Sequence, residues 1–209
     1  KYINVPNQRS VACDGITSNE IMNNFQISIK KGNNIIYATL LSHLNTIKNF
    51  SKSSYNIALI CEDDINLEFS KYWDKTIQEI IDNAPNDWEI IMLSYTLDKD
   101  KLIDTYTSNK QGHISCASAY IINKIGAKRL IDKIYQNEKY HLENDKCHTA
   151  DNYIFASMNT YTYKYSYFTH PNDNDSTIHH SHVEYHNQIK KIAEQIWKTH
   201  IFKDYNKSR

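Results

Sequence analysis

The sequence predicts an α/β domain whose sheet is mostly parallel and flanked by helices. Three short apolar runs, at residues 56–61, 88–93 and 115–122, are typical of strands buried on both faces. Segments with helical spacing of apolar residues lie between and after these runs. The 209 residues show no internal repeat and no long linker. We therefore expect residues 1–209 to form a single domain with a sizeable core.

The first predicted helix begins at Asn34, after a polar and irregular segment at residues 1–33. Its apolar residues recur at spacings of four, four and three: Ile36, Leu40, Leu44 and Ile47. The strand at 56–61 follows this helix. A second helix is expected to end before Pro85, with an apolar side made of Trp73, Ile77, Ile80 and Ile81.

The later half of the chain continues the pattern. A third helix is expected at 126–135, and a short fourth helix, capped by Thr149 or Asp151, should run through Met158. Residues 160–167 alternate as a half-solvated strand does, and their tyrosines favour packing over stacking on sugar rings. Residues 183–205 are predicted to form a C-terminal helix with Lys190 and Lys191 on a solvated face.

The composition excludes several classes of protein. With 24 basic and 24 acidic side chains the formal net charge is zero, which argues against a nucleic-acid binder. No apolar run approaches the roughly 18 residues that span a bilayer, and the first residues lack a signal-peptide pattern. The four Cys, none in a CxxC pair, favour reduced and mostly buried thiols.

These observations together predict a soluble protein of a reducing compartment, the cytoplasm being the simplest case. Asn, Ile, Lys and Tyr are abundant, and their AT-rich codons fit a viral or AT-rich microbial source. The oligomeric state is left open.

Three acidic residues, Glu62, Asp63 and Asp64, follow directly after the first apolar run. Adjacent carboxylates repel one another unless a cation offsets them, and Mn²⁺ or Mg²⁺ prefers such oxygen ligands. Ligands of α/β sheets bind beyond the carboxyl ends of the strands, which is where these acids should lie. The alternative is a solvated loop whose acids favour the start of the next helix.

Several motifs in order resemble glycosyltransferase family 25, which includes lipopolysaccharide and collagen galactosyltransferases. The resemblance extends from about Val11 to Ile178. Its motifs are Val11-Ala12-Cys13-Asp14-Gly15, Leu41-Ser42-His43-Leu44, Leu59-Ile60-Cys61-Glu62-Asp63-Asp64-Ile65, Asp87-Trp88-Glu89-Ile90-Ile91-Met92-Leu93, Ala119-Tyr120-Ile121-Ile122-Asn123-Lys124-Ile125-Gly126-Ala127, Ala150-Asp151-Asn152, and Pro171 with Asp175-Ser176-Thr177-Ile178.

The resemblance implies a GT-A-like, Rossmann-like fold and inverting transfer of a hexose from a UDP-sugar, most simply UDP-galactose or UDP-glucose. The acceptor would be a hydroxyl of a glycan or of a protein side chain. Glu62 and Asp64 would hold Mn²⁺ or Mg²⁺, and Asp63 would bind the donor's sugar or ribose. Asp151 matches the position of the base that takes the acceptor's proton, with a helix cap as the alternative. His43 would contact the donor's phosphate or orient an acidic neighbour.

A His-rich stretch near the C-terminus could complete the metal site. GT-A enzymes often use a His from this region, which here points to His180 or His182. A separate zinc site is the alternative, because His182 and His186 are spaced four residues apart. A solvated His-rich loop is the simplest interpretation.

The resemblance omits the strand and Arg-rich turn with which the family normally opens, since Lys1 corresponds to a point close to the family's second strand. Two other functions therefore stay open. A non-catalytic structural or carbohydrate-binding protein would retain the fold without the reaction. A metal-dependent phosphoesterase would also use clustered acids, although it typically needs two metals about 4 Å apart.

Overall fold

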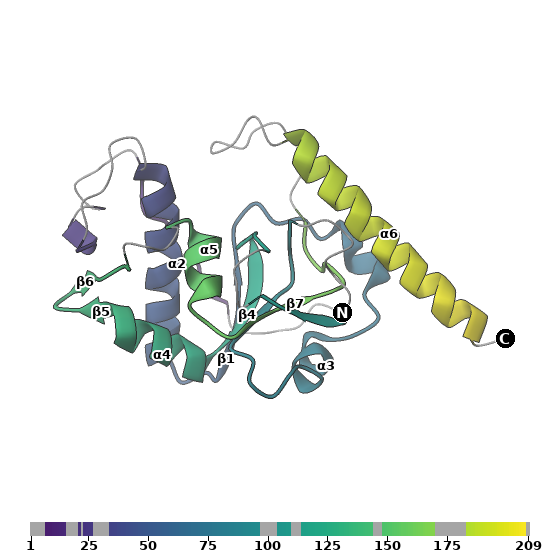
Figure 1. Ribbon diagram of the computed structural model, residues 1–209, viewed down its shortest axis with the longest axis horizontal. Helices are drawn as coiled ribbons and strands as arrows, with labels where there is room; N and C mark the ends of the chain where they lie inside the picture. Colours follow the sequence, from purple (N-terminus) through teal and green to yellow (C-terminus); the bar gives the residue numbers. More distant parts are fainter. Residues whose placement is uncertain are drawn as a thin grey trace.

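The protein folds around a five-stranded sheet with helices on both faces (Figure 1). The computed structural model describes residues 7–15, 21, 23–26, 34–96, 104–109, 114–143, 148–169 and 183–207. The strands of this sheet are β1 (Ile57–Cys61), β2 (Ile90–Met92), β3 (Tyr106–Ser108), β4 (Ala119–Asn123) and β7 (Thr160–Tyr163). A separate hairpin pairs β5 (Tyr135–Gln136) with β6 (Lys139–Tyr140).

The sheet is mixed and mostly antiparallel, so the predicted α/β class is confirmed and the predicted parallel sheet is wrong. The strand order is β1-β4-β2-β7-β3. Of the four pairings, only β2 with β7 is parallel. Strand β4 lies between β1 and β2 and runs opposite to both, and β3 runs opposite to β7 at the other edge. Since β1, β2 and β7 still point the same way, their carboxyl ends meet at one edge of the sheet.

Strand β1 lies at the edge of the sheet, which corrects the expectation that it is buried on both faces. Ile57 and Leu59 are 38% and 44% exposed, whereas Ile60 is buried. The exposed side chains alternate with the inward ones, as they must in a strand covered on one face only. A continuous apolar run therefore did not mean burial on both faces here.

One face of the sheet is covered by α2 (Asn34–Lys52), α4 (Lys124–Ile134) and α5 (Ala150–Ala156), which lie together in Figure 1. Leu40, Leu44 and Ile47, three residues of the predicted stripe, are fully buried there against the sheet residue Ile122. Both longer helices start within two residues of the predicted boundaries. The period of 3.6 residues located this face correctly.

The opposite face is covered by η1 (Glu68–Tyr72), α3 (Ile77–Asp82) and α6 (Val183–Lys207). Instead of one helix through Trp73, the chain forms η1 and α3 as two short helices. The break falls before Thr76, whose side chain accepts from Glu79 N while the Glu79 carboxylate accepts from Thr76 N, a complete capping box. This pattern begins α3 and prevents a continuous helix.

Helix α6 is the longest element and runs obliquely across this face (Figure 1). It is held by Ile189, Ala193 and Trp197, all buried, at spacings of four residues. Among the described residues, no helix combines the length and apolar character needed to cross a membrane.

Gly126 sets the close approach of α4 to the sheet, and replacing it by Ala is expected to destabilise the protein. A Cβ at this position would lie 2.6 Å from Glu89 Cβ and 2.7 Å from Met158 Cε. Since Glu89 Cβ is fixed by its own backbone, the helix must shift, at a cost of about 1–3 kcal/mol. That cost should exceed the roughly 1 kcal/mol that Ala contributes to helix propensity.

Chemical denaturation of Gly126→Ala measures this effect, with Ile125→Ala as the control variant from the same helical turn. Ile125 is 78% exposed, so its replacement should change the free energy of unfolding little. If the Gly126→Ala protein were as stable as the Ile125→Ala protein, a Cβ at residue 126 would not clash with Glu89 and Met158.

Candidate functional site

The predicted acidic triplet lies at the edge where β1, β2 and β7 end and β4 begins. The Glu62 amide donates to the Ser118 carbonyl at 2.8 Å, which continues the pairing of β1 with β4 by one residue. The triplet therefore starts directly beyond the carboxyl end of β1, as the sequence predicts. Residues from α2, β4 and α5 converge on the same edge.

A buried hydrogen-bonded chain holds Glu62. His43, on α2, is 6% exposed and lies between two partners: Nε2 is 3.1 Å from Glu62 Oε1, and Nδ1 is 3.1 Å from the Tyr120 hydroxyl. An ionised carboxylate only accepts, so Nε2–H donates to Glu62, and in a neutral imidazole Nδ1 then accepts from the Tyr120 hydroxyl. The imidazole tautomer and the position of the Glu62 carboxylate are thereby fixed together.

Tyr120 is suited to its place at the end of this chain. Burial, together with the charge of Glu62, raises the pKa of its hydroxyl far above the ordinary value. The hydroxyl thus keeps its proton and remains a donor to His43 at physiological pH. Its ring also stacks on the imidazole, with 5.8 Å between the ring centroids.

The other two acids of the triplet point into solvent. The side chain of Asp63 is 90% exposed and lies 3.8 Å from Arg9, itself 91% exposed. Asp64 is also exposed. The triplet therefore has two exposed carboxylates beside a half-buried one that His43 holds in place.

Asp151, the predicted base, lies in the first turn of α5 and joins that helix to the segment before β4. Its Oδ2 accepts from the Cys116 amide at 3.2 Å, and its Oδ1 accepts from the Asn152 amide at 2.8 Å. Thr149 is the N-cap residue of α5, and its side chain makes no capping bond. Asp151 is therefore not the N-cap of α5. Its carboxylate instead links α5 to the segment before β4.

Cys116, whose position no sequence pattern singled out, has an unusual backbone conformation beside this carboxylate. Its φ is 106°, a region that residues with a Cβ seldom adopt. Its buried Sγ lies 3.0 Å from Ser118 Oγ and 3.3 Å from Ser94 Oγ, and both hydroxyls are buried. Strained residues of this kind cluster at functional sites.

The thiols differ from one another in burial. Cys116 is buried, Cys13 is half-buried and Cys61 is exposed, and none of the three forms a disulfide within the part of the chain that the structure describes. The expectation of mostly buried thiols therefore fails for Cys61, because β1 exposes the face that carries it. Cys147 lies outside the described residues.

The donor set of the triplet suits a hard divalent ion in part. Glu62 and Asp64 supply carboxylate oxygens, and Glu62 has the outer hydrogen bond from a His that ligating carboxylates usually have. Within the part of the chain that the structure describes, no three His, Cys, Asp or Glu side chains gather closely enough to hold a metal. His180 and His182, predicted to complete the shell, lie outside the described residues.

Comparison with known proteins adds no identification. No protein-family model matches the chain, and no curated protein matches it either.

Proposed function

We propose that this protein is a metal-dependent inverting glycosyltransferase that moves a hexose from a UDP-sugar to a hydroxyl of a glycan or protein. The observation that carries this proposal is the acidic triplet at the carboxyl end of β1, with Glu62 anchored by the buried His43–Tyr120 pair. Such anchoring is what a metal-ligating carboxylate needs to keep its oxygens in place. The order of motifs similar to glycosyltransferase family 25 supports the same assignment.

In this proposal Glu62 and Asp64 hold Mn²⁺ or Mg²⁺, with His180 or His182 as a further ligand. The bound ion would neutralise charge on the donor's diphosphate. Asp63, which projects into solvent beside Arg9, would hydrogen-bond the sugar or ribose of the donor. His43 acts as a positioning residue through Glu62, because its ring is buried and both its nitrogens are already bonded.

Asp151 is the proposed base. The acceptor's hydroxyl oxygen forms a bond to the anomeric carbon while the bond from that carbon to the phosphate oxygen breaks. UDP leaves with the bonding pair, and the proton of the hydroxyl passes to the Asp151 carboxylate. Each Asp151 oxygen already accepts one hydrogen bond from a backbone amide. Because a carboxylate oxygen has two lone pairs, it can also accept a hydrogen bond from the acceptor's hydroxyl.

Donor binding tests the metal site directly. We expect calorimetric titration with UDP-galactose or UDP-glucose to show saturable binding only when Mn²⁺ is present. Asp64→Asn should weaken that binding by at least about 100-fold, because loss of even an outer partner of a metal ligand costs 10- to 100-fold. Asp132→Asn, an exposed acid on α4, is the matched control and should bind normally.

Two results would replace the proposal with its alternatives. In the first, the folded protein binds neither UDP nor the two UDP-sugars, with or without Mn²⁺. That result would favour a non-catalytic structural or carbohydrate-binding protein. Metal-dependent hydrolysis of p-nitrophenyl phosphate without donor binding would instead indicate a phosphoesterase.

A further inference from the structure

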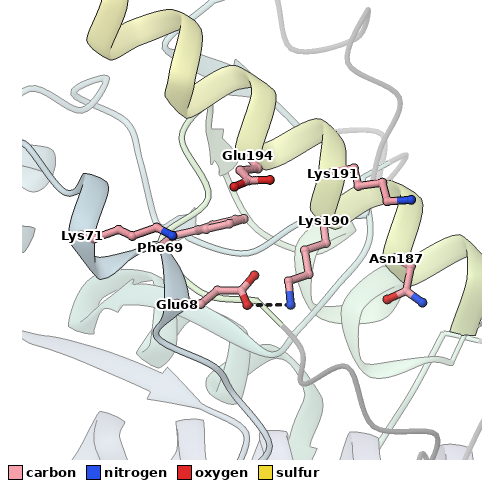
Figure 2. A pocket seen from close by; sticks show the side chains of 7 residues that line it. All are labelled: Glu68, Phe69, Lys71, Asn187, Lys190, Lys191 and Glu194. Atoms are coloured by element: carbon pink, nitrogen blue, oxygen red, sulfur yellow. Dashed lines mark ion pairs between the residues drawn. The ribbon is translucent and has the colours of Figure 1, made fainter.

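A cavity of about 560 Å³ lies between η1 and the N-terminal half of α6, apart from the acidic triplet. Figure 2 shows that its lining comes from these two elements. The lining side chains are Glu68, Phe69 and Lys71 from η1 and Asn187, Lys190, Lys191 and Glu194 from α6. The volume falls within the roughly 300–1,000 Å³ that is usual for sites that bind small molecules.

The cavity has an excess of positive charge. Three lysines and two glutamates line it, which gives a formal charge of +1. One of the glutamates, Glu194, is already paired at 3.1 Å with Lys198, which is outside the lining. The other, Glu68, is paired at 2.6 Å with Lys190. Each of these carboxylates thus has a lysine as its ion-pair partner.

The remaining cations are Lys71 and Lys191. Among the residues that the structure describes, neither forms an ion pair with a carboxylate. The Lys71 ammonium lies 4.9 Å from the centroid of the Tyr72 ring. This cation–π contact restricts the position of the ammonium group and leaves its positive charge in place. These two ammonium groups come from different elements and border the same space.

Lys190 differs from the solvated residue that the sequence predicts. Its side chain is only 19% exposed and is held by Glu68, as the dashed line in Figure 2 marks. Holding a long side chain in one rotamer costs conformational entropy. The ion pair with Glu68 already restricts the Lys190 side chain, so a ligand that binds Lys190 does not add this cost. The cavity therefore offers one fixed and two available ammonium groups, with the Asn187 amide as a further donor.

We infer that this cavity binds an anionic group, a phosphate ester or a carboxylate, on a ligand of sugar size. Ammonium groups bind both kinds of oxyanion through charge-assisted hydrogen bonds. Neutral sugars would gain little from the lysines. The inference does not depend on the proposed transfer reaction, because a binding protein would use the cavity in the same way.

Backbone NMR titration of the full chain tests the site. The probes are inorganic phosphate, glucose 6-phosphate, glucuronate and glucose, added to millimolar concentrations. We expect saturable shifts of amides in η1 and in residues 187–194 with at least one of the three anions, and none with glucose. A response to both phosphates alone indicates a phosphate ester, and a response to glucuronate alone indicates a carboxylate.

The variant Lys71→Gln/Lys191→Gln should weaken this binding by at least about tenfold, because it removes the two available charges. Both side chains are exposed, so the fold should be kept. Lys52→Gln/Lys128→Gln removes the same charge from exposed positions on α2 and α4 and should bind as the wild type does. The inference is overturned by equal shifts with glucose, by no saturable shift with any anion, or by unchanged binding in the Lys71/Lys191 variant.

Discussion

Replacing Asp151 by Asn is expected to lower the rate of sugar transfer by about 10²- to 10⁴-fold while donor affinity stays unchanged. The amide cannot take the acceptor's proton, whereas the acids that we propose to bind the metal belong to another segment and remain intact. Steady-state transfer rates, with calorimetric donor binding, measure the two quantities separately.

Asp151 also has a structural role, and the experiment must separate the two. Both of its oxygens accept from backbone amides, those of Cys116 and Asn152. An Asn side chain has one acceptor oxygen, so the variant should lose about 1 kcal/mol of stability. Asn152→Ala removes the hydrogen bond to Thr149 Oγ1 in the same helical turn and leaves the carboxylate in place. If Asn152→Ala slows transfer as much as Asp151→Asn does, the base role is wrong.

The longer helices and the positions of β1, β2, β4 and β7 could be predicted from their apolar patterns. The stripe from Ile36 to Ile47 located α2, and the apolar run before Asn123 located β4. Strand direction was not predictable in the same way. A central antiparallel strand such as β4 is buried on both faces and has the same continuous apolar pattern as a parallel one. The edge position of β1 depends on which strand pairs with it, and that is a property of the whole sheet.

Some local features were present in the sequence and were overlooked. The Thr76 to Glu79 spacing is a capping-box pattern and could have divided the second helix. Strand β3 has only three residues, which is too short for any period to appear.

The candidate site was predictable where its residues are adjacent in sequence and unpredictable where they are not. The triplet Glu62-Asp63-Asp64 was visible as a local cluster after a strand. The link from Glu62 through His43 to Tyr120 joins residues 19 and 77 positions apart. Tyr120 looked like an ordinary strand residue, and its hydroxyl acquires a role only because β4 packs under α2. Cys116 was missed because a positive φ in a residue with a Cβ has no signature in composition.

Replacing Trp197 by Ala is expected to remove about 3–5 kcal/mol from the free energy of unfolding, the largest stability loss of any substitution considered. Trp197 is fully buried, and its indole N–H donates to the Ser166 carbonyl at 2.8 Å. Its ring packs among those of Tyr72, Tyr165 and Tyr167, with centroids 5.1 to 6.4 Å away. Truncation would leave a cavity at the point where α6 is most firmly attached. Chemical denaturation measures the loss.

The control is Trp197→Phe, which keeps an aromatic ring but cannot donate to Ser166, and it should cost about 1–2 kcal/mol. Hydrogen exchange then shows where the loss is felt. Among the α6 side chains that the structure describes, Ile189 and Ala193 are the other two that are buried, and both are much smaller than Trp197. Amides of α6 should therefore exchange faster in Trp197→Ala, whereas those of α2 and β4 should change only with global stability. Since α6 carries Lys190 and Lys191, the same variant should lose anion binding in the η1–α6 cavity. Unchanged anion binding in Trp197→Ala, together with faster exchange of the α6 amides, would mean that the cavity does not depend on how α6 is packed.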